Sequence, residues 1–553
     1  MNKRIYTGAE SFEELIEGDY FYIDKTLFIK ELLENKGKAT LITRPRRFGK
    51  TMNMSMLESF FDINVDSKAL FDGLGIMKQT DIVEKHMNKY PVVFLTLKNI
   101  EEDTYEEAIG KIKKLISGLY KQHKHILQQQ GLDEIDKAEF LSYRNGETTE
   151  SNLKSALLFL TECLYTHYKK RVIVLLDEYD TPLTNALSEG YYDRMVKFMR
   201  GFLGSVFKTN KFLEFGVLTG VQRISKEGLV SSFNNPKVCG IIDREFATSF
   251  GFTEDEVRGA CEMYGLGDTY DEVKRWYDGY RFGGQDMYNP WSITGYLDRK
   301  EFSDYWVNTG SVDIFEDMFS KGCDSLKDDV AGLITGTPIT MHLKDGITYP
   351  VDYNNPDAFW TLLLNAGYLK PCNGAKGNRF GAELVNMEIR NIFSDCAKMW
   401  FETQPLPISG AIRKFVGLLL KGDAEGVSAA LNDDLLSNPS CHDFNDENSY
   451  HMFIYGMLLA LSEDYIVTSN LESGKGRSDC QIKPMDKGKH AVVIEFKHKS
   501  ESPDHLKEEA RKGLEQIGEK AYIHSLKREG YRHIYKYGIA FHKKNCEVVM
   551  EAG

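Results

Sequence analysis

The stretch LITRPRRFGKT at residues 41–51 decides how the first part of the chain folds. It continues an apolar run at 39–43, and apolar residues at helical spacing follow it: Met52, Met56, Leu57, Phe60 and Phe61. A strand, a polar turn and a helix in this order are the setting of a phosphate-binding loop. Backbone N–H groups and the helix N-terminus favour an anion there, Lys50 would reach the terminal phosphates, and the Thr51 hydroxyl would bind Mg²⁺.

One position departs from the usual loop pattern, G-x-x-x-x-G-K followed by Ser or Thr, because Arg44 stands where the first glycine is expected. A second, independent signal comes from VIVLLDEYD at 172–180, a continuously apolar strand that ends in Asp177 and Glu178. In a nucleotide hydrolase such a pair places the first acid near Mg²⁺ and the second near the attacking water. A strand ending in two acids is common by itself, but together with the loop it predicts a nucleotide-hydrolysing sheet.

Alternating strands and helices support that sheet. Residues 91–97 and 212–219 read as further buried strands, and the spacing at 104–130 and 148–169 is helical. The last strand ends at Thr219, which we expect beside the terminal phosphate, with Arg223 a candidate phosphate-contacting or subunit-contacting arginine. A plain strand-end hydroxyl and a solvated arginine are the competing interpretations. The residues expected to bind nucleotide are Arg46, Arg47, Phe48, Gly49, Lys50, Thr51, Thr219 and Arg223, with Thr51 and Asp177 on the metal.

Length and composition limit the class of protein. A chain of 553 residues is too long for one core, so we expect two or three domains. The net charge of -13 argues against a surface that coats nucleic acid nonspecifically, so any such contact must be local. Nine scattered cysteines without a C-x-x-C pair suggest neither a zinc site nor disulfides. With no signal peptide and no apolar run of about 18 residues, we expect a cytoplasmic protein without a membrane anchor.

The middle of the chain is less informative. Helical spacing at 254–276 leads into the aromatic segments WYDGYRF (276–282) and YNPW (288–291). These aromatics could stack on bases, but they are not interleaved with a basic stripe, which favours a packed turn in a helical lid, with a winged-helix shape as one option. A Pro- and Gly-containing linker near 403–410 separates a further domain. The predicted domains are 1–250, 251–402 and 403–553.

Several motifs together resemble a known family. These are YIDKT at 22–26, TRPRRFGKT at 43–51, LLDEYD at 175–180, LTGVQRIS at 218–225 and the aromatic segment at 276–293. They resemble the bacterial and archaeal AAA-ATPase-like family, in which the loop commonly reads RPRRFGK followed by Ser or Thr. The resemblance covers about residues 1–310 and implies an α/β, RecA/AAA-like P-loop ATPase core that uses ATP and Mg²⁺, with Glu178 as the base.

The C-terminal part carries a second group of chemical residues. A hairpin at about 466–482 contains Asp479, and the buried strand at 490–497 ends in Glu495 and Lys497. Residues two apart on a strand project to the same face, and Asp479 on the neighbouring strand can join them. Two acids there would bind a divalent ion that activates water, while the lysine orients the nucleophile or stabilises negative charge in the transition state.

This order resembles the PD-(D/E)XK nuclease superfamily, an α/β restriction-endonuclease-like fold. By that resemblance Glu447 is the first helical acid, and Asp479, Glu495, Lys497 and Gln516 follow, with Mg²⁺ or Mn²⁺ as the metal. The proline of the superfamily name is absent, because Ser478 precedes Asp479. Tyr450-His451 resembles an E-x-x-Y-H motif whose histidine either assists the site or caps the helix.

The sequence as a whole predicts an ATPase whose nucleotide state gates a metal-dependent nuclease-like domain acting on DNA or RNA. The alternatives are a nucleotide-dependent switch or interaction protein whose nuclease fold binds without cutting, and an ATPase scaffold whose C-terminal domain serves assembly. Oligomerisation stays open. For the loop itself, we expect Arg44→Gly to leave nucleotide binding largely intact.

Overall fold

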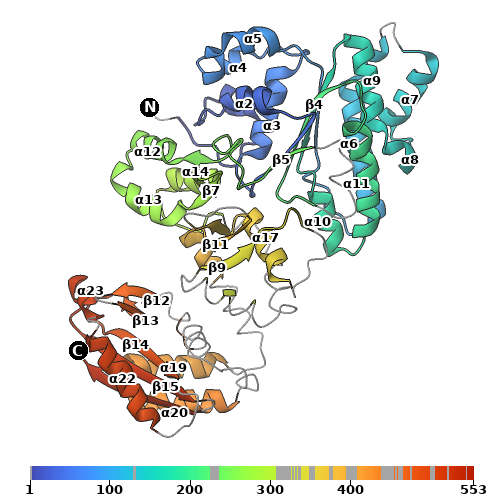
Figure 1. Cartoon of the computed structure of the whole chain (residues 1–553). Helices are drawn as coiled ribbons and strands as arrows, with labels where there is room; N and C mark the ends of the chain where they lie inside the picture. The colour runs from blue at the N-terminus through green and yellow to red at the C-terminus, as the bar shows by residue number, and fades with distance from the viewer. Residues whose placement is uncertain are drawn as a thin grey trace. The chain divides into compact units, whose positions relative to one another are not determined.

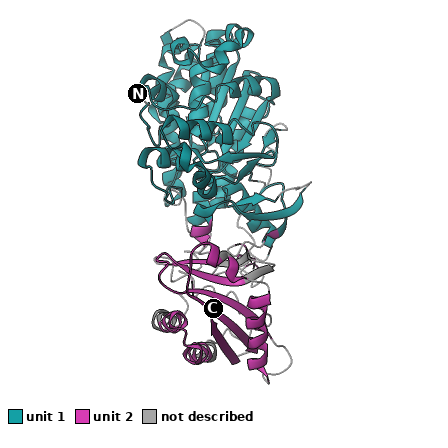
Figure 2. Cartoon of the chain, turned by 90° about the vertical axis from the view of Figure 1, so that its left-hand side faces the viewer, with its two compact units in different colours: residues 1–310, 340–389 teal, residues 311–339, 390–553 magenta. Residues whose placement is uncertain are grey.

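The computed structural model divides the chain into two compact units: residues 1–310 with 340–389, and residues 311–339 with 390–553 (Figure 2). The residues that the structure describes are 3–128, 132–224, 236–306, 326, 329–330, 333, 338–347, 355–372, 378–393, 408–437, 454, 458, 465–473, 476–498, 505–519, 522–542 and 545–553. The predicted boundaries after residues 250 and 402 fall inside unit 1 and unit 2, respectively.

A parallel five-stranded sheet forms the centre of unit 1. Its order is β2 (Val92–Thr96), β3 (Val172–Asp177), β4 (Leu213–Gly220), β1 (Ala39–Thr43) and β5 (Lys237–Cys239). All residues of β1 and β3 are buried, as their continuously apolar sequences require. The four strands predicted from the sequence are confirmed, whereas the short strand β5 was not predicted.

Helices cover both faces of this sheet. Figure 1 shows α3 (Lys50–Phe61) on one side and α6 (Tyr105–Gln122), α9 (Ala156–Tyr168) and α11 (Tyr192–Phe207) on the other. The segments predicted as helices at 104–130 and 148–169 are shorter and interrupted. The remaining helices here are α1 (Phe12–Glu17), α2 (Leu27–Asn35), α4 (Lys68–Phe71), η1 (Gly75–Lys78), α5 (Thr80–His86), η2 (Lys124–Gln128), α7 (Glu134–Asn145), α8 (Glu150–Leu153) and α10 (Thr181–Ser188).

The region predicted as a helical lid contains small sheets as well as helices. One antiparallel sheet has the order β6 (Phe252–Thr253), β8 (Gln285–Tyr288) and β7 (Tyr280–Phe282), and a second has the order β10 (Leu369–Pro371), β11 (Arg379–Leu384) and β9 (Ile339–His342). Its helices are α12 (Glu254–Met263), η5 (Gly267–Thr269), α13 (Tyr270–Tyr277), α14 (Pro290–Arg299) and α17 (Pro356–Ala366). The predicted aromatic segment belongs to the core here: Tyr277 and Tyr288 are buried in one apolar cluster with Val257 and Ile293.

Unit 2 is built on a mixed five-stranded sheet. Its order is β12 (Tyr465–Ser473), β13 (Gly476–Pro484), β14 (Ala491–His498), β15 (Ile534–His542) and β16 (Asn545–Ala552), and only the β14–β15 pair is parallel. The helices are α19 (Ile408–Lys421), α20 (Ala424–Ser437), α22 (Leu506–Glu519) and α23 (Ile523–Arg528). The predicted fold class, an ATPase-type α/β sheet followed by a second α/β domain, is confirmed.

Candidate functional site

The loop between β1 and α3 has the form of an anion site. Gly49 caps α3 with φ 78°, a left-handed conformation that glycine adopts without a steric cost. The Lys50 ammonium group turns back and donates to the carbonyls of Pro45 (2.9 Å) and Arg44 (3.3 Å). Burial lowers the pKa of Lys50, and Glu178, Asp177 and Asp180 partly offset that effect. A phosphate group in the loop would supply the negative charge that this buried lysine lacks.

Arg44 braces the loop from inside the protein. Its side chain is fully buried and donates to the carbonyls of Thr43 (2.8 Å), Gly240 (2.9 Å), Phe246 (3.0 Å), Cys239 (3.2 Å) and Glu245 (3.2 Å). The guanidinium group therefore ties the end of β1 to the end of β5 and the segment after it. This contact explains how the loop tolerates an arginine at its glycine position: the side chain points into the core and away from the loop opening.

The other loop residues have different surroundings. Arg46 and Arg47 are exposed, and the Arg47 guanidinium lies 4.2 Å from the centre of the Trp291 ring. Phe48 is fully buried, with ring centroids 4.8 Å from Tyr280 and 5.0 Å from Phe282. Of the three residues predicted to bind nucleotide here, Phe48 can therefore offer a ligand only its backbone.

Asp177, at the carboxyl end of β3, accepts hydrogen bonds from three threonine hydroxyls that lie at the ends of neighbouring elements. Thr51 donates to Oδ2 (2.7 Å), Thr219 donates to Oδ1 (2.5 Å), and Thr96 donates to Oδ2 (3.3 Å). The structure thus brings together the predicted residues Thr51, Asp177 and Thr219. Sequence reasoning missed Thr96, although it ends its strand in the same way as Thr219 and the same argument applied to β2 would have found it.

Glu178 follows Asp177 in a left-handed conformation, with φ 53°, which is uncommon for a residue with a side chain. Its backbone N–H donates to the Thr219 hydroxyl at 3.4 Å, and its carboxylate accepts from the Thr181 hydroxyl at 3.4 Å. Such backbone strain is typical of functional positions. Within the described residues, no hydrogen bond or ion pair joins the Arg223 side chain to this acidic pair, and the Arg223 carbonyl accepts from Ile347 N (2.8 Å).

In unit 2, β13 and β14 bring together the second group of predicted residues. The Asp479 carboxylate accepts a hydrogen bond from the backbone N–H of Phe496 at 2.7 Å, which places it beside Glu495. Lys497 Nζ lies 3.4 Å from Glu495 Oε1 and donates to the Phe496 carbonyl (2.8 Å). Gln516 on α22 also donates to Glu495 Oε1. Glu447, Tyr450 and His451 lie outside the described residues.

The electrostatics of this group favour a bound cation. Glu495 is 2% exposed, and among the described residues its Oε2 has no hydrogen-bond partner. Burial and, after it, the neighbouring Asp479 raise the pKa of Glu495 to about 8, and burial also raises the pKa of Asp479. A divalent ion would pair with the carboxylates of Asp479 and Glu495, including the Oε2 atom of Glu495, so the residues present fit a metal. Among the described residues, no three His, Cys, Asp or Glu side chains are grouped to hold one.

Helix α22 approaches the sheet closely at this group because two glycines face each other across the contact. Gly538 on β15 pairs with Glu495, and a Cβ atom on Gly538 would lie 1.9 Å from the Ala510 carbonyl oxygen. Gly513 on α22 is also close to the sheet, although less tightly, since its added Cβ would be 3.3 Å from the Glu495 carbonyl oxygen. This close packing puts Gln516 within reach of Glu495.

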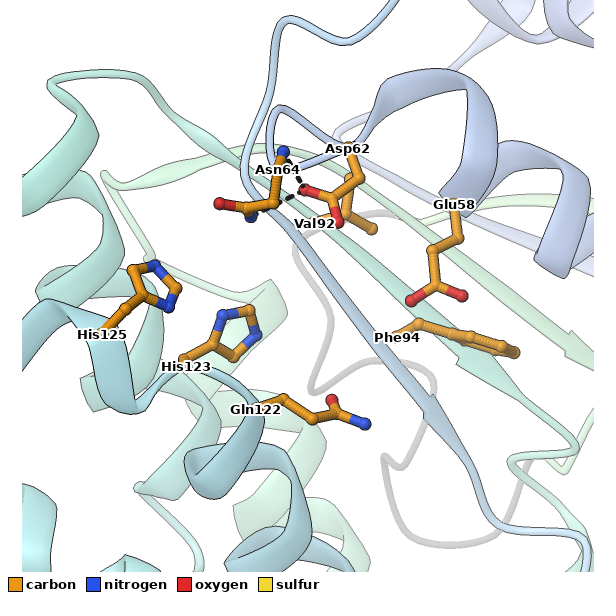
Figure 3. A pocket seen from close by; sticks show the side chains of 8 residues that line it. All are labelled: Glu58, Asp62, Asn64, Val92, Phe94, Gln122, His123 and His125. Carbon is orange, nitrogen blue, oxygen red and sulfur yellow. Dashed lines mark hydrogen bonds between the residues drawn. The ribbon is translucent and has the colours of Figure 1, made fainter. Parts of the chain in front are cut away.

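A cavity of about 250 Å³ lies by the start of β2, at the end of the sheet away from the loop. Figure 3 shows Glu58 and Asp62 on one side of it and His123 and His125 on the other. Burial raises the pKa of Glu58 to about 7 and lowers that of His123 to about 4. No sequence motif marked this place.

Comparison with known proteins gives two family matches. Residues 6–230 match the family model described as predicted AAA-ATPase, and residues 445–551 match that of the PD-(D/E)XK nuclease superfamily. A protein of Azotobacter chroococcum mcd 1, described as an uncharacterized protein in the vnfD 5′ region, is 25% identical over 99% of this chain and 98% of its own length. In the described part of the chain, no helix is long and apolar enough to cross a membrane.

Proposed function

Because the chain joins an AAA-ATPase-like domain to a domain of the PD-(D/E)XK nuclease superfamily, we propose that it hydrolyses ATP and that its nucleotide state gates metal-dependent cleavage of DNA or RNA. One observation carries the proposal: a single chain holds two separate carboxylate sites, each with the side chains that its chemistry requires. Asp177 has its hydroxyl partners beside a phosphate-type loop, and Glu495 has its lysine and glutamine.

In the first site, Lys50 and the loop N–H groups hold the phosphates of ATP, and Thr51 and Asp177 hold Mg²⁺. Thr96 and Thr219 fix both oxygens of Asp177, so the carboxylate cannot rotate away from the ion. Glu178 orients and deprotonates the attacking water, as the acid following a metal-binding aspartate does in phosphoryl transfer to water.

In the second site, Asp479 and Glu495 hold Mg²⁺ or Mn²⁺, with Glu447 a further candidate from the sequence. The ion supplies an activated water and neutralises charge on the phosphodiester. Lys497 stands beside the scissile phosphate, and Gln516 keeps Glu495 in position through its amide. Since Lys497 also contacts Glu495, its ammonium group is held at the carboxylate pair before a substrate arrives.

A second candidate is a nucleotide-dependent switch whose nuclease fold binds nucleic acid or a protein without cutting. The net charge of -13 favours it, because a protein that handles long nucleic acids gains affinity from a basic surface. The complete Asp479, Glu495 and Lys497 set favours cleavage.

The test uses plasmid DNA, single-stranded DNA and RNA with Mg²⁺ or Mn²⁺, with and without ATP. The variants are Lys50→Ala and Glu495→Ala, with Lys114→Ala and Glu515→Gln as controls because both side chains are exposed. We expect metal-dependent cleavage that ATP alters in the wild type and that Glu495→Ala loses. No cleavage of any substrate would leave the switch as the function, and ATP hydrolysis unchanged in Lys50→Ala would refute the assignment of the loop.

A further inference from the structure

The middle of the phosphate loop is held from outside the sheet. The backbone carbonyl of Arg46 accepts hydrogen bonds from Trp306 Nε1 (3.3 Å) and from Asn289 Nδ2 (3.4 Å). Asn289 is fully buried and Trp306 is 2% exposed. Trp306 lies 260 residues from Arg46 along the chain. Both donors therefore reach the loop only through the folding of the segment that follows the sheet.

A buried glutamate connects the two donors. Glu388 is fully buried; its Oε1 accepts from the backbone N–H of Trp306 (3.0 Å), and its Oε2 accepts from the Ser292 hydroxyl (2.8 Å). Ser292 lies in the first turn of α14, the helix whose N-cap is Asn289. These contacts close a ring that runs from the Arg46 carbonyl through Trp306, Glu388, Ser292 and Asn289 back to Arg46. We call it the Arg46 ring.

The Arg46 ring contains a carboxyl group, that of Glu388, in a buried position where a charge is unfavourable. The pKa of Glu388 is raised to about 7: burial is the largest cause, the donors Trp306 and Ser292 oppose it, and the neighbouring Asp304 adds to it. A buried carboxyl group costs stability that an apolar side chain of similar size would not. A contribution to stability therefore does not explain why a glutamate stands at this position. Its hydrogen bonds to Trp306 and to Ser292 of α14 do explain it, because they hold both groups in place.

The Arg46 ring sets the orientation of the peptide bond between Arg46 and Arg47. A trans peptide is planar, so its C=O and N–H groups point to opposite sides. With the Arg46 carbonyl fixed by two donors, the N–H of Arg47 is turned the other way. Arg47 itself has a left-handed backbone, with φ 67°, a conformation that residues with side chains rarely keep without support. Release of the carbonyl would let this peptide rotate and relax.

We propose that Trp306 and Glu388 are positioning residues for the phosphates of the nucleotide. They fix the Arg46–Arg47 peptide so that the Arg47 N–H faces the phosphate side of the loop. Neither side chain touches the ligand; both act through the Arg46 carbonyl. The inference rests on the proposed binding of ATP and adds that the loop is set by the region after the sheet.

Two pairs of variants test the ring in the full-length protein. Trp306→Phe removes the indole N–H and keeps a smaller aromatic ring in its place. Trp276→Phe makes the same change of ring and is its control, because that indole donates to Glu272 near the surface. Glu388→Ala removes both acceptors, whereas Glu388→Gln keeps an acceptor for the Trp306 N–H and can donate to Ser292. Glu383→Gln is the control on β11, where Glu383 pairs with Lys370.

The measurements are the Kd for ATP by titration calorimetry and the hydrogen exchange of loop amides with and without ATP. We expect Trp306→Phe to raise the Kd by about 3- to 10-fold, the loss typical of one hydrogen bond. Glu388→Ala should raise it at least as much, while Glu388→Gln and both controls stay near wild type. ATP should protect the loop amides in the controls and protect them less in Trp306→Phe and Glu388→Ala.

The result that overturns the inference is a wild type that binds ATP while Trp306→Phe and Glu388→Ala match their controls in both Kd and loop protection. If the melting temperature shows that Glu388→Ala is unfolded, Trp306→Phe against Trp276→Phe decides, because Trp306 donates directly to the Arg46 carbonyl. If Trp306→Phe is the unfolded variant, Glu388→Ala against Glu388→Gln and Glu383→Gln decides. A wild type that binds no ATP refutes the proposed function, and the inference with it.

Discussion

Arg44 has a role that the sequence alone did not reveal. From the sequence we expected Arg44→Gly to leave nucleotide binding largely intact, and a loss of binding would mean that Arg44 contacts the ligand or organises the loop. The structure gives a reason to expect a loss instead, because the guanidinium group donates to backbone carbonyls at the ends of β1 and β5 and in the segment after β5. Burial lowers the pKa of Arg44 to about 10, because the guanidinium group has lost its contact with water and is surrounded by those carbonyls instead.

We predict that Arg44→Gly lowers the free energy of unfolding by roughly 2–4 kcal/mol and weakens ATP binding. Several buried carbonyls lose their donor, and each unsatisfied group costs about 1–3 kcal/mol, partly relieved by entering water. Chemical denaturation and ATP titration measure both effects. Arg171→Ala is the control, since Arg171 is exposed and lies outside the loop. A glycine variant as stable as this control would contradict the role of Arg44.

Glu58 gives a prediction for pH. Its folded-state pKa of about 7 lies above the ordinary value of 4.5, so the folded protein favours the protonated form. Stability is therefore lost as pH rises from about 4.5 through 7. Glu58→Gln imitates the protonated form and should raise the free energy of unfolding by up to about 3 kcal/mol at pH 8.5, with little effect at pH 4.5. The exposed Glu17→Gln should show no such pH dependence. Equal effects of Glu58→Gln at both pH values would disprove the shift.

At the scale of elements, the contact between α22 and β15 decides whether the second acidic site keeps its shape. The helix lies so close to the strand that Gly538 leaves no room for a side chain, since its Cβ would also lie 2.9 Å from Leu514 N. Backbone atoms on both sides cannot yield as a flexible side chain could. The helix must move if any side chain is added there.

We predict that Gly538→Ala destabilises unit 2 by about 2–3 kcal/mol, the range of overpacking in a filled core, and slows cleavage by moving Gln516 away from Glu495. Gly518→Ala, on helix α22, is the matched control, because the added Cβ of residue 518 would meet nothing within 4 Å. That change should stabilise the helix by up to about 1 kcal/mol. Thermal unfolding and the cleavage rate measure the pair; a Gly538→Ala protein equal to wild type would show that α22 can shift without cost.

At the scale of the molecule, the two acidic sites belong to different compact units. We predict that Glu495→Gln lowers nucleic-acid cleavage by at least about 100-fold while ATP hydrolysis stays within about twofold of wild type, because its carboxylate serves only the second site. Lys50→Ala should abolish ATP hydrolysis and the effect of ATP on cleavage, yet leave cleavage without ATP. Parallel assays of both activities decide the matter. Loss of ATP hydrolysis in Glu495→Gln would mean that the sites are not separable.

Trp306 and Glu388 also matter at this scale. They lie just before the points where the chain leaves unit 1, after Gly310 and after Ile389. A change in the phosphate loop that moves the Arg46 carbonyl therefore acts on residues near two of the three points where the chain passes from one unit to the other. This arrangement supports the proposed gating, and it makes Trp306→Phe a variant in which the response of cleavage to ATP should be reduced.

The sequence by itself determined the features that are contiguous along the chain: the strand, loop and helix around Lys50, the apolar strand ending in Asp177 and Glu178, and the Glu495–Lys497 pair. Each follows from local spacing, because side chains two apart on a strand, or a turn between a strand and a helix, have a fixed geometry. Even the order of Asp479, Glu495 and Gln516 could be read from motifs. Strand β5 was missed because three residues give too short a pattern.

Only the tertiary structure decided which distant residues meet. Thr96 reaches Asp177, Arg44 reaches the carbonyls beyond β5, and Trp306 reaches Arg46 across 260 residues. No periodicity reports such pairs, since they depend on how completed strands and helices pack. The same limit applies to Arg44: a sequence shows that a glycine is missing, but only packing shows whether the side chain in its place points at a ligand or into the core.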